Sequence, residues 1–393
     1  MKTSDFSKDS WGRVIRTAGG YDAFVPSRLP PKLELNWELV ASLSRADRRL
    51  AELAGAAGTL PNSHLLIAPF IRREAVLSSQ IEGTQASLSD LFLYEAAPSG
   101  TRDSRREGVS DVREVANYVH ALDYGLKRLE TLPISLRLMR ELHERLMEGV
   151  RGDRLTPGEF RRSQNWIGRP GCTLDEAVFV PPPVEEMTKA LSDLEAFLHS
   201  PSTLPPLIRI AMVHYQFEAI HPFVDGNGRI GRLLVSLLLC HEGLLKHPLL
   251  YLSAFFERRR EDYYRLLLDV SRKGSWAAWI EFSLSAVEEQ SRDVVWRMEN
   301  LLALRKQYRS RFESARSSAL LLALVDDLFE TPVLMIPRVA KRLKITHRAA
   351  MLNVRKLVDA GIVEEVTGRM RSMVFVSRGI LKILDQAKAS APK

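Results

Sequence analysis

The sequence predicts a mainly α fold with two short β segments. Apolar residues recur at helical spacing in stretches such as residues 207–220, and residues 233–239 are apolar without a break. Short apolar runs separated by turn residues, a pattern typical of strands, occur around residues 158–183 and 362–377. The chain of 393 residues is long enough for two or three domains, and its 45% hydrophobic content is ordinary for a globular protein.

The first 111 residues are predicted to form an N-terminal helical region. Residues 21–32 are too rich in proline for a helix and are expected to be an extended lead-in. Helices are expected over residues 36–57 and 63–80, the second of which ends at Ser78-Ser-Gln-Ile-Glu82-Gly83. From the residues alone, Glu82 is a solvated carboxylate at the end of a helix and Gly83 is its C-cap.

A further helix is expected after this break, capped by Ser87 or Thr84. Residues 96–111 contain few apolar residues and many helix breakers, so they are expected to form a surface loop.

Residues 112–282 are predicted to form the central domain. Helices are expected over residues 112–122 and 135–148, and a β-hairpin is expected from Phe160–Gly168 and Val178–Pro183. The helical stripe of residues 251–268 is more typical of a core than of a ligand site. Trp276, Trp279 and Phe282 are expected to close this core.

Residues 221–232 read His-Pro-Phe-Val-Asp-Gly-Asn-Gly-Arg-Ile-Gly-Arg and lie between two predicted core helices. Glycines at a helix N-terminus let a phosphate approach unpaired N–H groups, and Arg229 and Arg232 suit phosphate oxygens. Asp225 is a hard oxygen ligand of the kind that Mg²⁺ takes, and His221 can accept a proton near neutral pH. Together these residues predict transfer of a phosphorus group to a hydroxyl.

This stretch resembles the signature of the Fic family, His-Pro-Phe-x-Asp/Glu-Gly-Asn-Gly/Lys-Arg-x-x-Arg, and every defined position matches. The resemblance implies a Fic catalytic core that transfers AMP from Mg²⁺-bound ATP to a Ser, Thr or Tyr hydroxyl of a target protein, or of itself. His221 would deprotonate the hydroxyl, Asp225 would hold Mg²⁺, and Arg232 would bind the γ-phosphate. The implied nucleotide-binding set is Gly226, Asn227, Gly228, Arg229, Gly231 and Arg232.

The same resemblance separates two branches of the family. The related Doc branch transfers phosphate and carries Lys at the place of Gly228 and Ala at the place of Gly226. This chain therefore resembles the branch that transfers AMP.

The stretch from Ser78 to Gly83 resembles the Ser-x-x-x-Glu-Gly inhibitory motif of Fic proteins that are inhibited from their N-terminal side. The resemblance implies that Glu82 pairs with Arg232 in place of the γ-phosphate, so that ATP binds only in an unproductive pose. Two further groups of residues follow from the family. Ile167 and Phe179 would face the target protein from the hairpin, which is called the flap, and Tyr263 or Tyr264 would line the adenine pocket.

The C-terminal part of the chain is predicted to be a separate module. Residues 300–393 hold 18 Lys and Arg against 8 Asp and Glu, whereas residues 1–299 hold 38 against 40, so the basic excess lies in the C-terminal part. Residues 283–316 are expected to be a connecting helix, and residues 317–393 resemble a winged helix-turn-helix domain. DNA would bind through residues 336–376, with His347, Arg348, Arg355 and Lys356 facing the groove. Winged helices also serve as protein-docking and dimerisation modules.

The sequence leaves two alternatives to AMP transfer open. The same site could remove AMP from a modified protein, or the protein could be a DNA-binding regulator whose core senses a nucleotide. A homodimer is plausible for the family.

We expect a cytoplasmic protein without a membrane span. Its two cysteines, Cys172 and Cys240, have neither a disulfide framework nor metal-ligand spacing. Residues 1–10 lack the apolar core of a signal peptide, and the longest apolar run, residues 233–240, is too short to cross a bilayer.

Overall fold

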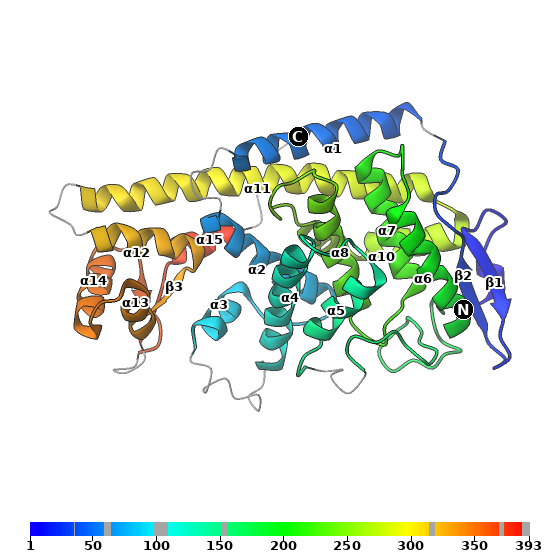
Figure 1. Ribbon diagram of the computed structural model, residues 1–393, viewed down its shortest axis with the longest axis horizontal. Helices are drawn as coiled ribbons and strands as arrows, with labels where there is room; N and C mark the ends of the chain where they lie inside the picture. Colours follow the sequence, from blue (N-terminus) through cyan, green and yellow to red (C-terminus); the bar gives the residue numbers. More distant parts are fainter. Residues whose placement is uncertain are drawn as a thin grey trace.

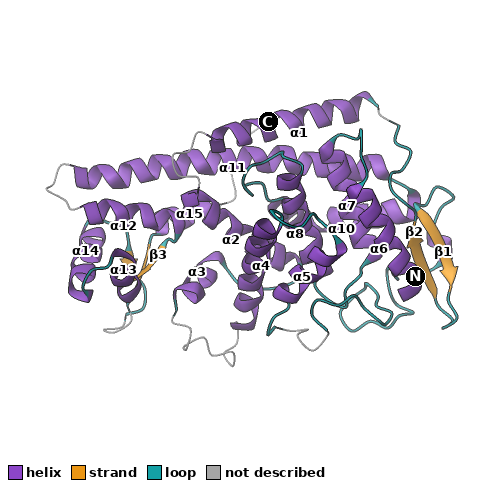
Figure 2. Ribbon diagram, viewed as in Figure 1, coloured by secondary structure: helices purple, strands orange, loops and turns teal. Residues whose placement is uncertain are grey.

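The protein is described by a computed structural model that places residues 1–34, 36–58, 64–97, 109–150, 156–313, 319–368 and 373–386. Helices make up most of the structure (Figures 1 and 2). The helices of the N-terminal and central parts are α1 (Trp37–Gly58), α2 (His64–Ile81), α3 (Leu88–Ala96), α4 (Val109–Arg128), α5 (Leu136–Leu146), α6 (Val184–His199), α7 (Pro206–Ile220), α8 (Asn227–His241), α9 (Ser253–Arg258) and α10 (Arg260–Lys273).

The predicted helices of these parts are largely confirmed, with small differences at their ends. Ser87 is the cap of α3, because its hydroxyl accepts a hydrogen bond from the Asp90 N–H at 3.1 Å. The single helix expected over residues 251–268 is instead two helices, α9 and α10, which meet at Arg259. Of the loop expected over residues 96–111, residues 98–108 lie outside the described residues, and residues 109–111 begin α4.

The longest helix, α11 (Trp276–Glu313), runs along most of the length of the molecule (Figure 1). α1 lies alongside it and turns a buried stripe of Leu39, Ala46, Leu50 and Leu53 inward at helical spacing. The connecting helix expected at residues 283–316 therefore begins earlier, at Trp276, so the central domain and the connector share one continuous helix.

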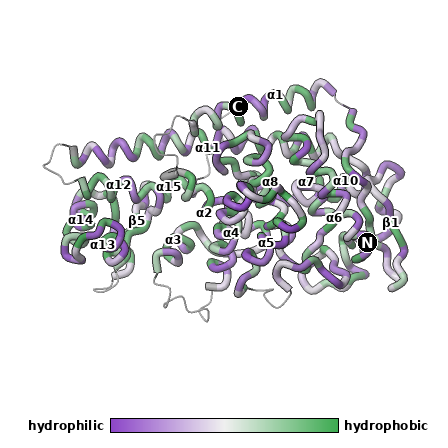
Figure 3. The backbone as a smooth tube through the Cα atoms, in the orientation of Figure 1, coloured by the Kyte–Doolittle hydropathy of each residue, from purple (hydrophilic) through white to green (hydrophobic). Residues whose placement is uncertain are grey.

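α7 and α8 form the centre of the core, and almost all of their side chains are buried. Figure 3 shows hydrophobic segments gathered around α8. Burial on all sides holds both helices firmly, because close-packed interiors resist displacement. The loop between them is consequently carried by a rigid frame.

Residues 21–32 are extended and contain no helix, as predicted, but the sequence did not predict that residues 12–26 form a β-hairpin. β1 (Gly12–Arg16) pairs antiparallel with β2 (Asp22–Pro26) in the register Gly12↔Pro26. Pro26 is tolerated because it stands at the end of its strand. The hairpin lies against the core through Phe24, which is fully buried and whose N–H donates to the Val180 carbonyl at 2.9 Å.

The C-terminal unit combines four helices with a three-stranded antiparallel sheet in the order β3-β5-β4. Its elements are α12 (Ala319–Glu330), β3 (Val333–Met335), α13 (Ile336–Leu343), α14 (His347–Asp359), β4 (Glu364–Glu365), β5 (Val374–Val376) and α15 (Arg378–Asp385). β4 and β5 lie where the sequence predicts two short strands, whereas β3 and α15 were not predicted, and residues 369–372 of the expected wing tip lie outside the described residues. The winged helix therefore stays a prediction.

The C-terminal unit packs directly against α2, mainly through α12. A buried arginine of α11, Arg297, ties the same unit to α11. It pairs with Asp293 at 2.7 Å and donates to the Leu384 and Gln386 carbonyls at the end of α15, at 2.9 and 2.7 Å. None of the helices in the described part of the chain has the length and apolarity needed to cross a membrane.

Candidate active site

The loop between α7 and α8 begins with an unusual backbone conformation at His221. This residue caps α7 in the left-handed region, with φ 50° and ψ 60°, and its N–H still donates to the Phe217 carbonyl at 3.0 Å. Such a conformation is unfavourable for a residue with a side chain and is concentrated at functional sites. Gly226, at φ 78°, then turns the chain into α8.

The His221 imidazole is held in one orientation. Its Nδ1 lies 3.3 Å from the Glu218 carbonyl oxygen, which only accepts hydrogen bonds, so Nδ1 carries the proton and Nε2 is the acceptor. Burial lowers the pKa of His221 to about 4, so the ring is neutral at pH 7. This is the tautomer and the charge state that a general base requires.

Two side chains of the loop, those of Asn227 and Arg229, bond to other parts of the protein and so hold the loop in place. The Asn227 amide bonds both backbone groups of Phe223, at 2.8 and 2.9 Å, so this side chain staples the loop and is not available to a phosphate. Arg229 is buried and pairs with Glu114 of α4 at 3.2 Å, which supports the first turn of α8 from behind. Asp225 projects outward with its side chain 50% exposed.

Arg232 forms its hydrogen bonds through Nε and Nη2, all to the end of α2, whereas its Nη1 has no hydrogen-bond partner among the described residues. Its Nε donates to the Ser78 hydroxyl at 2.9 Å, and Nη2 donates to the Ser78 carbonyl at 2.8 Å and to Glu82 Oε1 at 2.7 Å. The predicted pairing of Glu82 with Arg232 is therefore present. Burial alone would raise the pKa of Glu82, but the attraction of Arg232 outweighs it and holds that pKa below its ordinary value.

The Glu82 carboxylate also lies against the first turn of α8. A Cβ added to Gly228 would stand 2.2 Å from Glu82 Oε1 and 2.9 Å from Arg232 Nη1. The partial positive charge of a helix N-terminus favours an anion at this position. The carboxylate thus occupies the place where the sequence predicts a phosphate, and Gly83, with φ +98°, ends α2 immediately beyond it.

Two further buried carboxyl groups surround Arg232, and sequence reasoning missed both. Burial raises the pKa of Glu218 to about 8 and that of Glu74 to about 7. Glu218 also explains Gly231, which was expected to bind nucleotide. A Cβ on Gly231 would stand 2.2 Å from Glu218 Oε1, so this glycine serves close packing of α8 on α7. The only sequence signal was the position of Glu218 one turn before His221.

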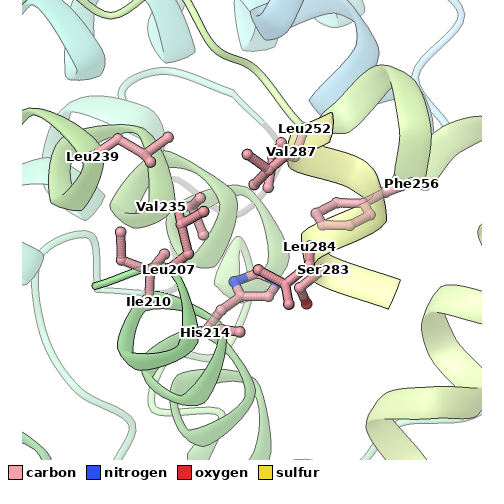
Figure 4. Close-up of a pocket in the computed structure, with 11 residues that line it drawn as sticks. Leu207, Ile210, His214, Val235, Leu239, Leu252, Phe256, Ser283, Leu284 and Val287 are labelled. Atoms are coloured by element: carbon pink, nitrogen blue, oxygen red, sulfur yellow. The ribbon is translucent and has the colours of Figure 1, made fainter. Parts of the chain in front are cut away.

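The prediction for the adenine pocket is corrected at Tyr263. Its ring is 1% exposed and its hydroxyl bonds His214 Nε2 at 2.9 Å, so it belongs to the core, whereas Tyr264 is 41% exposed. His214 also borders an internal cavity of about 20 Å³ (Figure 4), which has room for about one water and not for a purine. Tyr264 therefore stays the prediction for the adenine pocket.

The flap prediction is confirmed only in part. The expected hairpin is reduced to a single antiparallel bridge, Ile167↔Phe179. Ile167 is 37% exposed, but Phe179 is 6% exposed and packs on Phe24 with ring centroids 5.6 Å apart, so it cannot face a target. Trp166 and Val178, which the sequence did not single out, are 41% and 46% exposed.

The flap segment is tied to the catalytic loop by two side chains that sequence reasoning also missed. Arg161 is buried and its Nε donates to the His221 carbonyl at 3.0 Å. The Asn165 amide donates to the Phe223 carbonyl at 2.8 Å. These bonds hold Ile167 and its neighbours next to the predicted base.

The four basic residues expected to face DNA all lie exposed on α14. These residues are His347, Arg348, Arg355 and Lys356. They belong to a different part of the molecule from the loop at His221.

The fold and the loop together define a helical domain in which a helix N-terminus and a buried arginine lie near a neutral histidine. Residues 40–127 match the model of the Fic/DOC family N-terminal region, and residues 133–239 match that of the Fic/DOC family. The chain belongs to the Fic/DOC family. A Fic family protein from Desulfovibrio desulfuricans has a similar fold, with a TM-score of 0.55 and 21% identity over 89% of this chain and 98% of that one.

Other similar proteins match over a smaller part of the chain. The structure of residues 134–508 of Fic-1 from C. elegans gives a TM-score of 0.53 at 22% identity, over 67% of this chain and 74% of that one. Proteins named "Protein adenylyltransferase Fic" from Drosophila erecta and Drosophila virilis are 29% and 30% identical over 192 residues, 47% of this chain. The chain spans 35% and 36% of the length of these two relatives.

Proposed function

We propose that the protein transfers AMP from ATP to a Ser, Thr or Tyr hydroxyl of a target protein, and of itself. The observation that carries this proposal is the Glu82 carboxylate, which lies on Arg232 and on the first turn of α8 and so marks an anion site near the neutral His221. The adenylyltransferase names of the Drosophila relatives support the same reaction.

In this reaction the target hydroxyl oxygen bonds to the α-phosphorus of ATP, and the bond from that phosphorus to the bridging oxygen breaks. Pyrophosphate leaves, and the hydroxyl proton passes to Nε2 of His221. A general base positioned in this way contributes roughly 10²- to 10⁴-fold. The first N–H groups of α8 would face the phosphates, and Arg232 would bind the terminal one.

Mg²⁺ fits this site through Asp225. The carboxylate is half exposed and lies one residue before the glycine that caps α8. Among the residues that the structure describes, no group of three or more His, Cys, Asp or Glu side chains is placed to hold a metal ion. One carboxylate plus phosphate oxygens is how Mg²⁺ commonly binds with a nucleotide, where it neutralises phosphate charge.

We further propose that Glu82 inhibits the transfer. Its carboxylate bonds Nη2 of Arg232 and lies against the helix N-terminus, so while Glu82 stays in place it takes the position at which the γ-phosphate would bind. The Ser78 hydroxyl accepts a hydrogen bond from Arg232 Nε and so orients the guanidinium toward Glu82. Removal of the carboxylate would free both groups for ATP.

The test is self-labelling with ATP that carries its label on the α-phosphate, with γ-labelled ATP as control. We expect weak label on the wild type, strong label on Glu82→Gly, and none on Glu82→Gly combined with His221→Ala. Glu185→Gln is a matched control, since Glu185 is an exposed carboxylate at the start of α6. Label from the γ-phosphate would contradict AMP transfer, and equal α-label on wild type and Glu82→Gly would contradict inhibition.

A second proposed activity is DNA binding through residues 336–376. It rests on the four exposed basic side chains of α14 and on the net positive charge of the C-terminal part. DNA affinity that falls steeply with salt, and that drops in Arg348→Ala and Arg355→Ala, is the expected result.

We also propose that the protein is located in the cytoplasm. Its two cysteines are free, which favours a reducing compartment.

A further inference from the structure

We infer that His143 of α5 is a positioning residue that ties the Asp225 backbone to the segment that precedes the flap. The inference rests on the proposed AMP transfer, because it concerns the placement of the carboxylate that would hold the metal ion. His143 lies outside the signature loop, 82 residues before Asp225.

The imidazole bridges two separate pieces of backbone. Its Nδ1 accepts the Gly158 N–H at 2.9 Å, and its Nε2 lies 3.0 Å from the Asp225 carbonyl oxygen. The ring also stacks on Phe223, with centroids 3.8 Å apart and planes 4° from parallel. The side chain is therefore held at both nitrogens and on one face, and the residue is 2% exposed.

The two partners leave only one protonation form of the ring. A backbone N–H only donates, so Nδ1 must be an acceptor, and a backbone carbonyl only accepts, so Nε2 must carry the proton. Because the ring is rigid, the pair of bonds sets the separation between Gly158 and the Asp225 carbonyl. Gly158 is itself held from the other side, since Arg140 Nε donates to its carbonyl at 2.8 Å.

The position of the Asp225 backbone decides two features of the candidate site. It sets where the Asp225 carboxylate projects, and it sets where α8 begins, because Gly226 follows directly. A Cβ on Gly226 would stand 3.7 Å from the His143 ring and 3.1 Å from Met147 Sδ, so the ring also limits where this turn can lie. Loss of a residue that positions a metal ligand typically lowers metal affinity or activity by about 10- to 100-fold.

Two substitutions separate the two bonds. In His143→Asn the side-chain oxygen can replace Nδ1 toward Gly158, but nothing reaches Asp225. In His143→Gln the amide NH₂ can replace Nε2 toward Asp225, while the bond to Gly158 is lost. A matched control is His199→Asn, because His199 Nε2 bonds the Ile134 carbonyl at 2.8 Å far from the loop.

The first measurement is the Mg²⁺ concentration for half-maximal α-label transfer, in the Glu82→Gly background. We expect an increase of about 10- to 100-fold for His143→Asn, a smaller increase for His143→Gln, and no change for His199→Asn. Unchanged Mg²⁺ dependence of His143→Asn would overturn the inference, even if its melting temperature falls.

The second measurement is amide hydrogen exchange, which needs no activity. Faster exchange of residues 225–228 in His143→Asn, and of Gly158 in His143→Gln, is the expected pattern. Equal exchange in both variants would overturn the positioning role. If Glu82→Gly transfers no label at all, the proposed function fails, while hydrogen exchange still decides the role of His143.

Discussion

Replacement of Glu82 by Gln should strengthen ATP binding about tenfold. The carboxylate makes a charge-assisted hydrogen bond of 2.7 Å with Arg232, and such bonds contribute about 1.5–3 kcal/mol. Because the Glu82 side chain is 36% exposed, solvent screening favours the lower end of this range. About 1.5 kcal/mol corresponds to about tenfold in a dissociation constant.

The comparison of ATP with ADP isolates the γ-phosphate. ADP lacks the group that would bind Arg232, so in the wild type, where Glu82 occupies this arginine, the two nucleotides should bind about equally. In Glu82→Gln the preference for ATP over ADP should rise about tenfold, because the freed guanidinium gains the γ-phosphate.

The assay is isothermal titration calorimetry in a His221→Ala background, which prevents turnover. Glu185→Gln is again the matched control and should leave both affinities unchanged. An ATP-to-ADP preference that is the same with and without the Glu82 carboxylate would refute the reasoning, since Arg232 would then not be the γ-phosphate site.

Three further predictions concern stability. Arg297→Met should lower the free energy of unfolding by about 3–5 kcal/mol in urea titrations, because the buried Asp293 loses its 2.7 Å partner and keeps only the longer contact with Arg73 at 3.7 Å; a loss below 1 kcal/mol would contradict this. The pKa of Glu218 is raised to about 8, so the stability from its protonated form is fully present below its ordinary pKa and is lost as pH rises through about 8. The free energy of unfolding of Glu218→Gln should therefore rise relative to that of the wild type by about 1.4 kcal/mol per pH unit between pH 5 and 8. A difference between the two proteins that does not change with pH would contradict the raised pKa. Phe179→Ala should cost about 3–5 kcal/mol and the exposed Ile167→Ala about 0.5 kcal/mol or less, so equal melting temperatures would argue against the burial of Phe179.

The candidate site was predictable where its residues are adjacent in the chain. His221, Asp225 and the glycines lie within one turn between two helices, so local spacing alone places them together. The pairing of Glu82 with Arg232 joins residues 150 positions apart and came only from resemblance to the family. Residue spacing by itself favoured a solvated carboxylate for Glu82.

The errors share one physical cause. Whether an aromatic ring faces a ligand or the core depends on what packs against it, and Phe24, from a hairpin that the sequence did not predict, covers Phe179. Tyr263 and Tyr264 are neighbours on one helix, and the partner His214 lies 49 residues from Tyr263. Periodicity shows that such a helix has a buried face, but not which neighbour fills it.

By itself the sequence determined the mainly helical fold, the loop from His221 to Arg232 and the basic C-terminal unit, because each depends on residues that are close in the chain. Only the tertiary structure decided that Glu82 lies on the N-terminus of α8, that Asn227 braces the loop, and that His143 holds Asp225 from behind. It also placed the C-terminal unit against α2, the helix that carries Ser78. These contacts join distant segments, and their geometry is set by how the helices pack.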